Sequence, residues 1–103
     1  VTAEIAQAED GMVGALVLPD GKRVQLGEAV AVIGRLPECA VALSDPQVSR
    51  HHAEIRPAHI GYRLIDLGSM NGTLVNGTRV GEHDLRDGDV IVIGGTSIRY
   101  EES

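Results

Sequence analysis

Phenylalanine and tryptophan are absent from this 103-residue chain, which also has only two tyrosines. Large aromatic side chains therefore cannot dominate its interior. The hydrophobic content of 43% is still enough for one packed core, which must consist mainly of Val, Ile, Leu and Ala. Because Val and Ile are β-branched and favour strands, this composition predicts an all-β domain.

Cysteine is nearly absent as well. The single Cys39 has no partner for an intramolecular disulfide or a cysteine-based zinc site, which is typical of a reducing compartment such as the cytoplasm. We interpret Cys39 as a small buried hydrophobic side chain. No apolar run approaches the roughly 18 residues of a membrane span, and the N-terminus lacks the basic and apolar segments of a signal peptide. We therefore expect a cytoplasmic domain with no membrane contact.

Basic residues are too few for broad contact with nucleic acid, because such contact requires many Lys and Arg side chains to neutralise phosphates. The formal net charge is −6. Residues 1–10 and 101–103 hold five acidic residues and no Lys or Arg, which leaves nine basic against ten acidic residues between 11 and 100. We expect no nucleic-acid partner, although a local basic pocket for one anion is compatible with this distribution.

Short apolar segments separated by turn signals dominate the chain. Gly, Pro, Asn and Asp punctuate it about every 8 to 12 residues, a spacing typical of a sandwich or barrel. The expected strands are 13–18, 24–26, 29–33, 41–43, 52–56, 62–66, 73–75, 90–93 and 97–100. The four β-branched residues of 90–93 indicate a strand buried on both faces. Residues 1–11 lack a clear period and are interpreted as a linker or an edge-strand lead-in to a domain over 12–103.

Three loops between these strands carry unusual polar chemistry. They contain Gly34-Arg35, residues 49–52 (Ser-Arg-His-His) and residues 68–73 (Gly-Ser-Met-Asn-Gly-Thr). Loops at one end of a β-sandwich often carry binding groups on a rigid scaffold. Arg35, Ser49 and Arg50 together offer two cations and a hydroxyl, and a guanidinium holds a tetrahedral anion through a planar fork of donors. These loops form the candidate site.

Five motifs in this order resemble the forkhead-associated (FHA) family. They are Gly34-Arg35, Ser49-Arg50 with His52 two positions on, Asn71-Gly72-Thr73, Val75-Asn76-Gly77, and Gly88-Asp89 leading into Ile91, Ile93 and Gly94. Together they cover about residues 30–94. The resemblance implies a β-sandwich of about eleven mostly antiparallel strands with ligand-binding loops at one end. It also implies a module that binds phosphothreonine in a partner protein, a recognition mode that uses Arg clusters.

The resemblance implies a role for each residue at the phosphate. Arg35 and Ser49 would touch the phosphate, and Arg50 would grip the phosphate or the peptide backbone. The chain departs from the family at Met70, where members often have a Thr whose hydroxyl can reach the phosphate. We therefore expect this contact to be missing or to be supplied by the Met70 backbone amide.

The remaining implied site residues orient the peptide or support the loops. Asn71 would clamp the backbone of an extended peptide, since its amide offers both a donor and an acceptor. Asn76 and Gln47 would also lie beside the peptide, and Gln47 stands where some relatives have an Arg that reads the ligand three residues after the phosphothreonine. Four further residues would support the site: Gly34, His52, Gly72 and Thr73. Turn chemistry alone is the open alternative for Ser49, Asn71 and Asn76.

Other functions have weaker support in the sequence. Ser49 lies near two His residues and Asp45, the side-chain types of a hydrolase, but no Gly-x-Ser-x-Gly elbow is present. His51 and His52 would alternate between the faces of a strand, so they could not bind one metal ion together. We expect no catalysis, no metal and no cofactor.

The expected partner is a phosphothreonine-containing protein, or a phosphorylated segment of the domain's own parent chain, in Ser/Thr kinase signalling. The isolated domain is expected to be monomeric. The open alternative is an FHA-shaped scaffold that makes phosphate-independent contacts or oligomers through a sheet face.

Overall fold

The structure, a computed structural model, describes residues 13–103, and the interpretation of residues 1–11 lies outside these residues. The described residues form eleven strands and no helix. The strands are β1 (Gly14–Val17), β2 (Arg23–Gln25), β3 (Ala31–Gly34), β4 (Val41–Ala42), β5 (Ala53–Pro57), β6 (Tyr62–Asp66), β7 (Thr73–Val75), β8 (Thr78–Arg79), β9 (Glu82–Asp84), β10 (Val90–Ile93) and β11 (Thr96–Glu102). None of the described residues belongs to a helix with the length and apolarity needed to cross a membrane.

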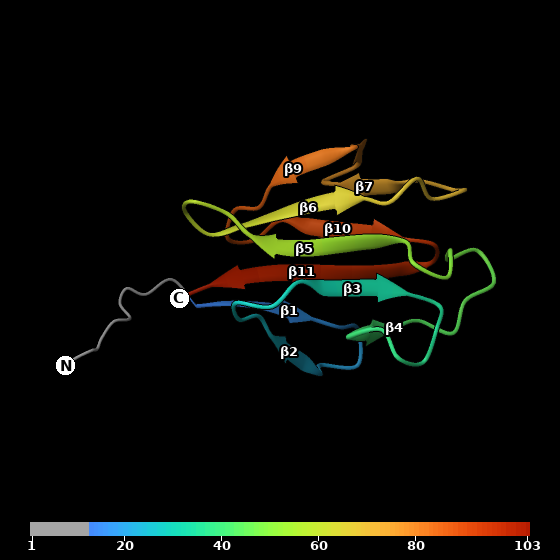
Figure 1. Cartoon of the computed structure of the whole chain (residues 1–103), viewed down its shortest axis with the longest axis horizontal. Coiled ribbons are helices and arrows are strands. Elements are labelled where there is room, and N and C mark those ends of the chain that lie inside the picture. The colour runs from blue at the N-terminus through green and yellow to red at the C-terminus, as the bar shows by residue number, and fades with distance from the viewer. Residues whose placement is uncertain (1–12) are drawn as a thin grey trace.

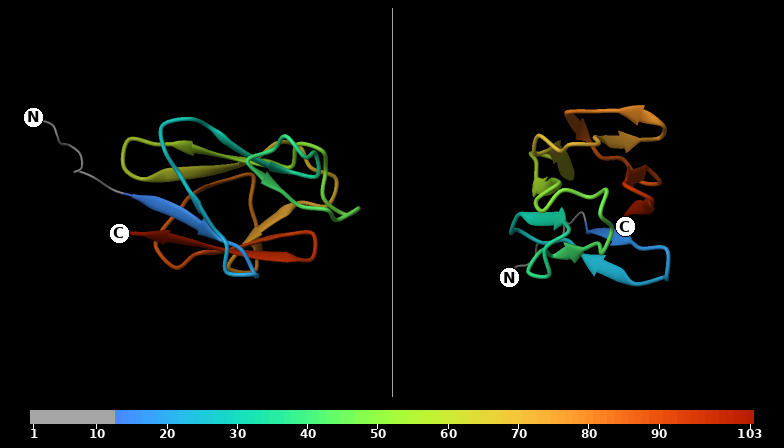
Figure 2. Two further views of the ribbon diagram at one scale, coloured as in Figure 1. Left: turned by 90° about the horizontal axis from the view of Figure 1, so that it is seen from below. Right: turned by 90° about the vertical axis from the view of Figure 1, so that its right-hand side faces the viewer.

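The strands form two sheets that pack face to face (Figure 1, Figure 2). Sheet A has the strand order β2-β1-β11-β10-β7-β8, and sheet B has the order β4-β3-β5-β6-β9. All pairings are antiparallel except that of β3 with β4. The predicted β-sandwich of about eleven mostly antiparallel strands is therefore confirmed.

Alternating side chains along the strands fill the space between the sheets. In β6 the side chains of Tyr62 and Leu64 are buried while Arg63 between them is exposed, as expected for a strand with one face in the core. The two tyrosines meet edge to face, with the ring centroids of Tyr62 and Tyr100 6.3 Å apart. Eight large core side chains are at most 1% exposed: Leu16, Ile33, Ile55, Leu64, Ile91, Ile93, Ile98 and Tyr100. The core is mainly aliphatic, as the composition predicts.

The prediction that residues 90–93 are buried on both faces is wrong. In β10, Ile91 and Ile93 are fully buried, but Val90 is 38% exposed and Val92 is half-buried. Each sheet of a two-layer sandwich has only one face in the core, so the alternate side chains of β10 point outward. The apolar run therefore places two valines on the outer face of sheet A.

The sequence pattern does not predict β8 and β9. These strands are two and three residues long and carry polar or charged residues such as Arg79 and Glu82. Each lies at the edge of its sheet, where short charged strands are common. A two-residue turn joins β7 to β8, and its residues Asn76 and Gly77 have φ of 51° and 87°. Both positive values are typical of the type I′ hairpin turn that the Asn-Gly pair favours.

Four connections gather at one end of the sandwich, at the right of Figure 1. They are the β3–β4, β4–β5, β6–β7 and β10–β11 connections. The first three contain the polar loops that the sequence marks as unusual, and the C-terminus lies at the opposite end. The fold therefore places residues from distant parts of the sequence at one surface.

The aliphatic core gives a direct prediction about stability. Ile91→Ala should lower the free energy of unfolding by about 2–5 kcal/mol, because it removes buried methyl groups and leaves a cavity. The matched control is Ile60→Ala in the β5–β6 connection, where the side chain is 74% exposed and the change should stay within about 0.5 kcal/mol. Urea unfolding followed by far-UV circular dichroism measures both. Equal effects of the two substitutions would contradict the assignment of Ile91 to the core.

Candidate functional site

Arg35 is bound to the β4–β5 connection through both its backbone and its side chain. The Arg35 N–H donates to the Ser49 carbonyl at 3.0 Å, and the Arg35 Nε–H donates to the Val48 carbonyl at 3.0 Å. No described residue accepts a hydrogen bond from the two terminal nitrogens of Arg35. The exposed guanidinium is thus held beside residues 47–50, which we call the serine loop, with two donor groups still available.

Gly34 permits this contact because a side chain would not fit. A Cβ atom at position 34 would lie 2.0 Å from the Arg50 carbonyl oxygen and 3.1 Å from Cys39 Sγ. The Cys39 thiol itself donates to the same carbonyl at 3.5 Å. The end of β3 therefore approaches the backbone of the serine loop at a distance that only glycine allows.

His52 connects the serine loop to the β6–β7 connection. Its side chain has no exposed surface. The Ser49 N–H donates to His52 Nδ1 at 3.1 Å, and His52 Nε2 lies 2.8 Å from the Gly72 carbonyl oxygen. A carbonyl can only accept, so Nε2 carries the proton and the ring is the neutral tautomer with Nδ1 as acceptor. One buried imidazole thus fixes two loops that are 20 residues apart in the chain.

Two further hydrogen bonds join the serine loop to residues 67–72, which we call the asparagine loop. The Met70 N–H donates to Ser49 Oγ at 3.1 Å, and Asn71 Nδ2 donates to the Gln47 carbonyl at 2.8 Å. The Met70 side chain is 84% exposed and points away from the core. Ser49 is only partly exposed. Its hydroxyl accepts from the asparagine loop, and its own proton is still available to a ligand.

Asp66, which the sequence analysis does not single out, organises the asparagine loop. Its carboxylate accepts hydrogen bonds from Ser69 N–H at 2.8 Å, Ser69 Oγ at 2.6 Å and Thr73 Oγ1 at 2.7 Å. Ser69 Oγ in turn accepts from the Gly72 N–H at 2.9 Å. An Asp three residues before a Ser, at the start of a Gly-rich loop, is the sequence signal that could have identified this turn. Thr73, fully buried, thereby supports the loop through its hydroxyl.

Asp45 attaches the β10–β11 connection to the serine loop. Its carboxylate accepts from the Gln47 N–H and from the Gly95 N–H, each at 2.9 Å. A Cβ atom at Gly94 would lie 2.7 Å from Asp45 Oδ2, so this contact again depends on a glycine. The hydrogen bond from Gly95, followed by that from Gln47, lowers the pKa of the Asp45 carboxyl and keeps it charged.

A cavity of about 230 Å³ opens beside the two loops. It is lined by residues of the loops and of the adjoining sheet A: Gln47, Asn71, Gly72, Leu74, Val92 and Gly94. Gln47 and Asn71 make part of its lining polar, and Leu74 and Val92 make another part apolar. This arrangement suits an extended segment that presents its backbone to Asn71 and a side chain to Leu74 and Val92.

Asn76 lies apart from this cluster. It follows Val75, which pairs with Ile91 near the start of β10, whereas Thr73 pairs with Ile93 at the other end of that strand. Asn76 Nδ2 donates to Asp89 at 2.9 Å, and its Oδ1 accepts from the Val90 N–H at 2.9 Å. The Asn76 amide therefore holds the β7–β8 turn against the start of β10.

The side chains of a hydrolase are not arranged for catalysis. Both ring nitrogens of His52 bind backbone groups, and the Asp45 carboxylate binds the backbone of Gln47 and Gly95. Ser49 Oγ accepts from an amide and has no histidine partner among the described residues. His83 is half-buried and binds Asp89 at 3.0 Å on another part of the molecule.

Asp66 provides a test of how the asparagine loop is held. Burial raises the pKa of the Asp66 carboxyl, but the hydrogen bonds from Ser69 and Thr73 outweigh it and hold the pKa below the usual 3.8. The charged Asp66 carboxylate therefore makes its full contribution to the free energy of unfolding above pH 3.8. This contribution is lost as the pH falls through the lower pKa of the folded state. We expect Asp66→Asn to unfold at lower urea concentration than wild type at neutral pH, and the difference to shrink in acid. The control is Glu38→Gln, which removes the charge of an exposed carboxylate. A difference between Asp66→Asn and wild type that does not change with pH would contradict the role of the Asp66 charge.

Known proteins are similar to this chain in both sequence and fold. The FHA domain family model matches residues 31–94. The chain is 40% identical over 74 residues to the glycogen accumulation regulator GarA of Mycobacterium tuberculosis, covering 72% of this chain and 46% of GarA. It is also 40% identical over 97 residues to the FHA domain-containing protein FhaA of the same organism, covering 94% of this chain and 17% of FhaA. The chain thus spans less than half the length of these curated relatives.

Solved structures agree with this relationship. The FhaA FHA domain complexed with the intracellular domain of Rv3910 matches with a TM-score of 0.80 and 42% identity, over 85% of this chain and 99% of that one. Mycobacterium tuberculosis EmbR in complex with a low affinity phosphopeptide matches with a TM-score of 0.81 and 34% identity, over 86% of this chain and 24% of EmbR. The family model, which covers more than half of the chain, and these similarities in sequence and fold show that the chain belongs to the FHA domain family.

Proposed function

We propose that the serine and asparagine loops bind a phosphothreonine-containing segment of a partner protein. The observation that carries the proposal is the hydrogen bond from the Met70 N–H to Ser49 Oγ, because it brings the two loops together beside the Arg35 guanidinium. A phosphothreonine carries about −1.5 to −2 charges and three acceptor oxygens. Arg35, Ser49 and Arg50 would donate to these oxygens. The Met70 N–H already donates to Ser49 Oγ, so the contact that a Thr hydroxyl makes in other members would be missing here.

The peptide backbone would lie against Asn71. Its Nδ2 is fixed by the Gln47 carbonyl, so its orientation is set before the peptide arrives and its Oδ1 is presented as an acceptor. A side chain of the peptide would enter the cavity lined by Gln47, Leu74 and Val92. In this proposal Gly34, His52, Gly72 and Thr73 hold the loops, and Asn76 acts indirectly by holding the β7–β8 turn.

The relatives support a role in Ser/Thr kinase signalling. EmbR is in complex with a phosphopeptide, and the FhaA FHA domain is in complex with the intracellular domain of another protein. The partner of this domain would be a protein, or a segment of its own parent chain, phosphorylated by a kinase in the cytoplasm, where ATP is available. The domain over residues 12–103 would act as a monomeric binding module without catalysis of its own.

Arg35 tests the phosphate site. Arg35→Ala should weaken binding of a phosphothreonine peptide about a hundredfold, since two charge-assisted hydrogen bonds are together worth about 3 kcal/mol. The matched control is Arg63→Ala, because Arg63 lies on the outer face of sheet B and pairs with Asp84. Isothermal titration calorimetry with the phosphorylated peptide and its dephosphorylated form measures both variants. Unchanged affinity in Arg35→Ala would remove Arg35 from the site, and equal binding of the dephosphorylated peptide would favour a phosphate-independent scaffold.

Met70 tests the departure from the family pattern. Met70→Thr should bind the same peptide about three- to tenfold more tightly, because it adds one hydroxyl donor beside the phosphate. Leu67→Thr is the control, since this side chain is exposed and belongs to the same loop. A gain in both variants, or in neither, would show that position 70 does not face the phosphate.

A further inference from the structure

The outer faces of the two sheets differ in their chemistry. On sheet B, Val32 and Ile65 also face outward. Most outward side chains there are charged, however, and several bind one another, as in the pairs Arg56–Glu54 at 2.6 Å and Arg63–Asp84 at 2.7 Å. Such paired charges are typical of a sheet face in contact with solvent. The central strand β10 of sheet A instead points Val90 and Val92 outward. Sheet A therefore has apolar side chains at the centre of its outer face that do not contribute to the core.

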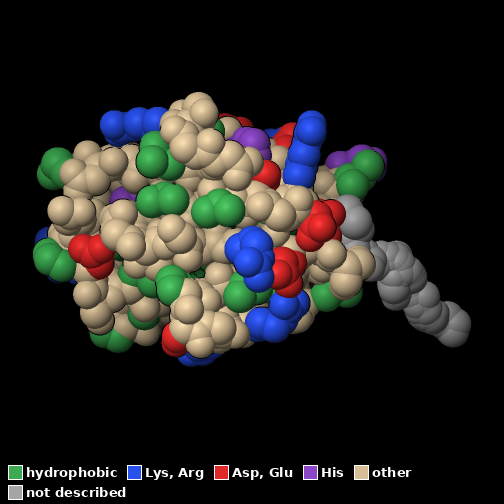
Figure 3. Space-filling model, turned by 180° about the vertical axis from the view of Figure 1, so that it is seen from behind, with side chains coloured by type: hydrophobic (Ala, Val, Ile, Leu, Met, Phe, Trp, Pro, Cys, Tyr) green, Lys and Arg blue, Asp and Glu red, His purple; other side chains and the backbone are tan. Residues whose placement is uncertain are grey.

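The strand register places further side chains on this outer face. Val92 lies opposite Leu74 of β7, while Arg99 of β11 lies opposite Val90 on one side and Val17 of β1 on the other. We call these five residues the β10 surface. Figure 3, which views the molecule from behind, shows hydrophobic side chains across the middle of this face with charged side chains beside them.

The β10 surface is continuous with the candidate phosphopeptide site. Val92 lines the cavity of about 230 Å³ that also contains Asn71. Val90, two residues away on the same face of the strand, lines a second cavity of about 410 Å³ together with Val17 and Arg99. Two residues along a strand span only about 7 Å. A single extended segment could therefore leave Asn71 and follow β10 from the first cavity into the second.

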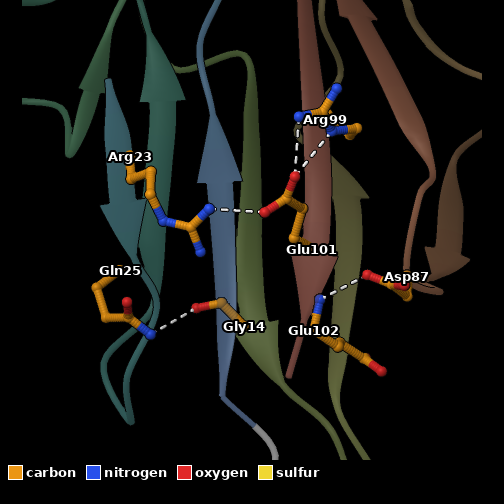
Figure 4. Close-up of polar contacts among 7 residues, drawn as sticks. All are labelled: Gly14, Arg23, Gln25, Asp87, Arg99, Glu101 and Glu102. Atoms are coloured by element: carbon orange, nitrogen blue, oxygen red, sulfur yellow. Dashed lines mark hydrogen bonds and ion pairs between the residues drawn. The ribbon is translucent and has the colours of Figure 1, made fainter. Parts of the chain in front are cut away.

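The charges on this face favour an acidic occupant. Arg23 and Arg99 both bind the Glu101 carboxylate, at 2.6 and 2.9 Å, so two guanidinium groups share one negative charge (Figure 4). Arg79 lies opposite Leu74 in the register and adds a further positive charge near the first cavity. Among these residues three arginines thus stand against the one carboxylate of Glu101, although the whole chain has a net charge of −6.

We propose that the β10 surface is an extension of the phosphopeptide site that binds an acidic segment with interspersed apolar residues, in the same partner and adjacent to its phosphothreonine. The inference rests on the proposed function. The apolar residues of the partner would lie on Val90, Val92 and Val17, and its carboxylates would pair with Arg99 and Arg79. Partners would accordingly be selected by residues well beyond those that surround the phosphothreonine.

The experiment uses synthetic peptides that share one phosphothreonine core, chosen from a degenerate library for binding to the wild-type domain. The core is extended on one side or the other by about eight residues, which span roughly 26 Å. The extension alternates Asp and Ile, and in a second series it alternates Lys and Ile. We expect the acidic extension on one side of the core to lower Kd roughly tenfold relative to the core alone. The basic extension should give no gain.

Variants of the domain then test whether the acidic extension binds at the β10 surface. Val90→Asp and Arg99→Gln should lose most of the gain from the acidic extension while binding the core peptide as wild type does. The matched control for Arg99→Gln is Arg56→Gln, because each arginine binds a glutamate two residues away on its own strand. Arg56→Gln should keep the full gain.

Each failure has a distinct meaning. If no phosphothreonine peptide binds the wild-type domain, the proposed function is overturned, and this inference with it. If the core binds but the acidic extension adds nothing, or if Val90→Asp retains the gain, this inference alone is overturned. Sedimentation of the wild type as a dimer that Val90→Asp dissociates would show that a second copy of the chain occupies the surface, which also overturns it.

Discussion

The binding end of this domain depends on one buried imidazole. His52 accepts from the Ser49 N–H and donates to the Gly72 carbonyl, so a single side chain satisfies one backbone group from each of two loops. A buried ring must satisfy both nitrogens, because an unpaired buried polar group costs about 1–3 kcal/mol. The spacing between the serine and asparagine loops is therefore set by the width of the ring. The contacts of Ser49 and Asn71 across the same gap follow from that spacing.

Two carboxylates stand close to loops that are proposed to bind an anion. Asp66 and Asp45 would weaken such binding if their charges faced the ligand. Instead each carboxylate accepts hydrogen bonds from the backbone or hydroxyl groups of its own loops, three at Asp66 and two at Asp45. Their negative charges are thereby used to fix loop conformation, and the guanidinium groups of Arg35 and Arg50 remain exposed. A rigid site of this kind loses little conformational entropy when a peptide binds.

Much of the fold could be predicted because strand patterns are local. The segments 62–66, 73–75 and 90–93 were predicted with the bounds that the structure shows, since each is an apolar or alternating run between turn residues. The edge strands β8 and β9 were missed because their residues are polar, and only the neighbouring strand makes them extended. The outer face of β10 was also mispredicted, because four β-branched residues look alike from the sequence whether both faces are covered or only one.

By itself the sequence determined the fold class, the aliphatic core and the set of polar loops that resemble the FHA motifs, because these depend on residue type and short-range spacing. Only the tertiary structure decided which side chains meet. It placed Asn76 against Asp89, assigned Asp45 to loop support, and left Val90 and Val92 facing outward. These outcomes depend on contacts between segments 13 to 50 residues apart, or on which layer covers a strand. No local pattern specifies such contacts, because the register and packing of the sheets determine them.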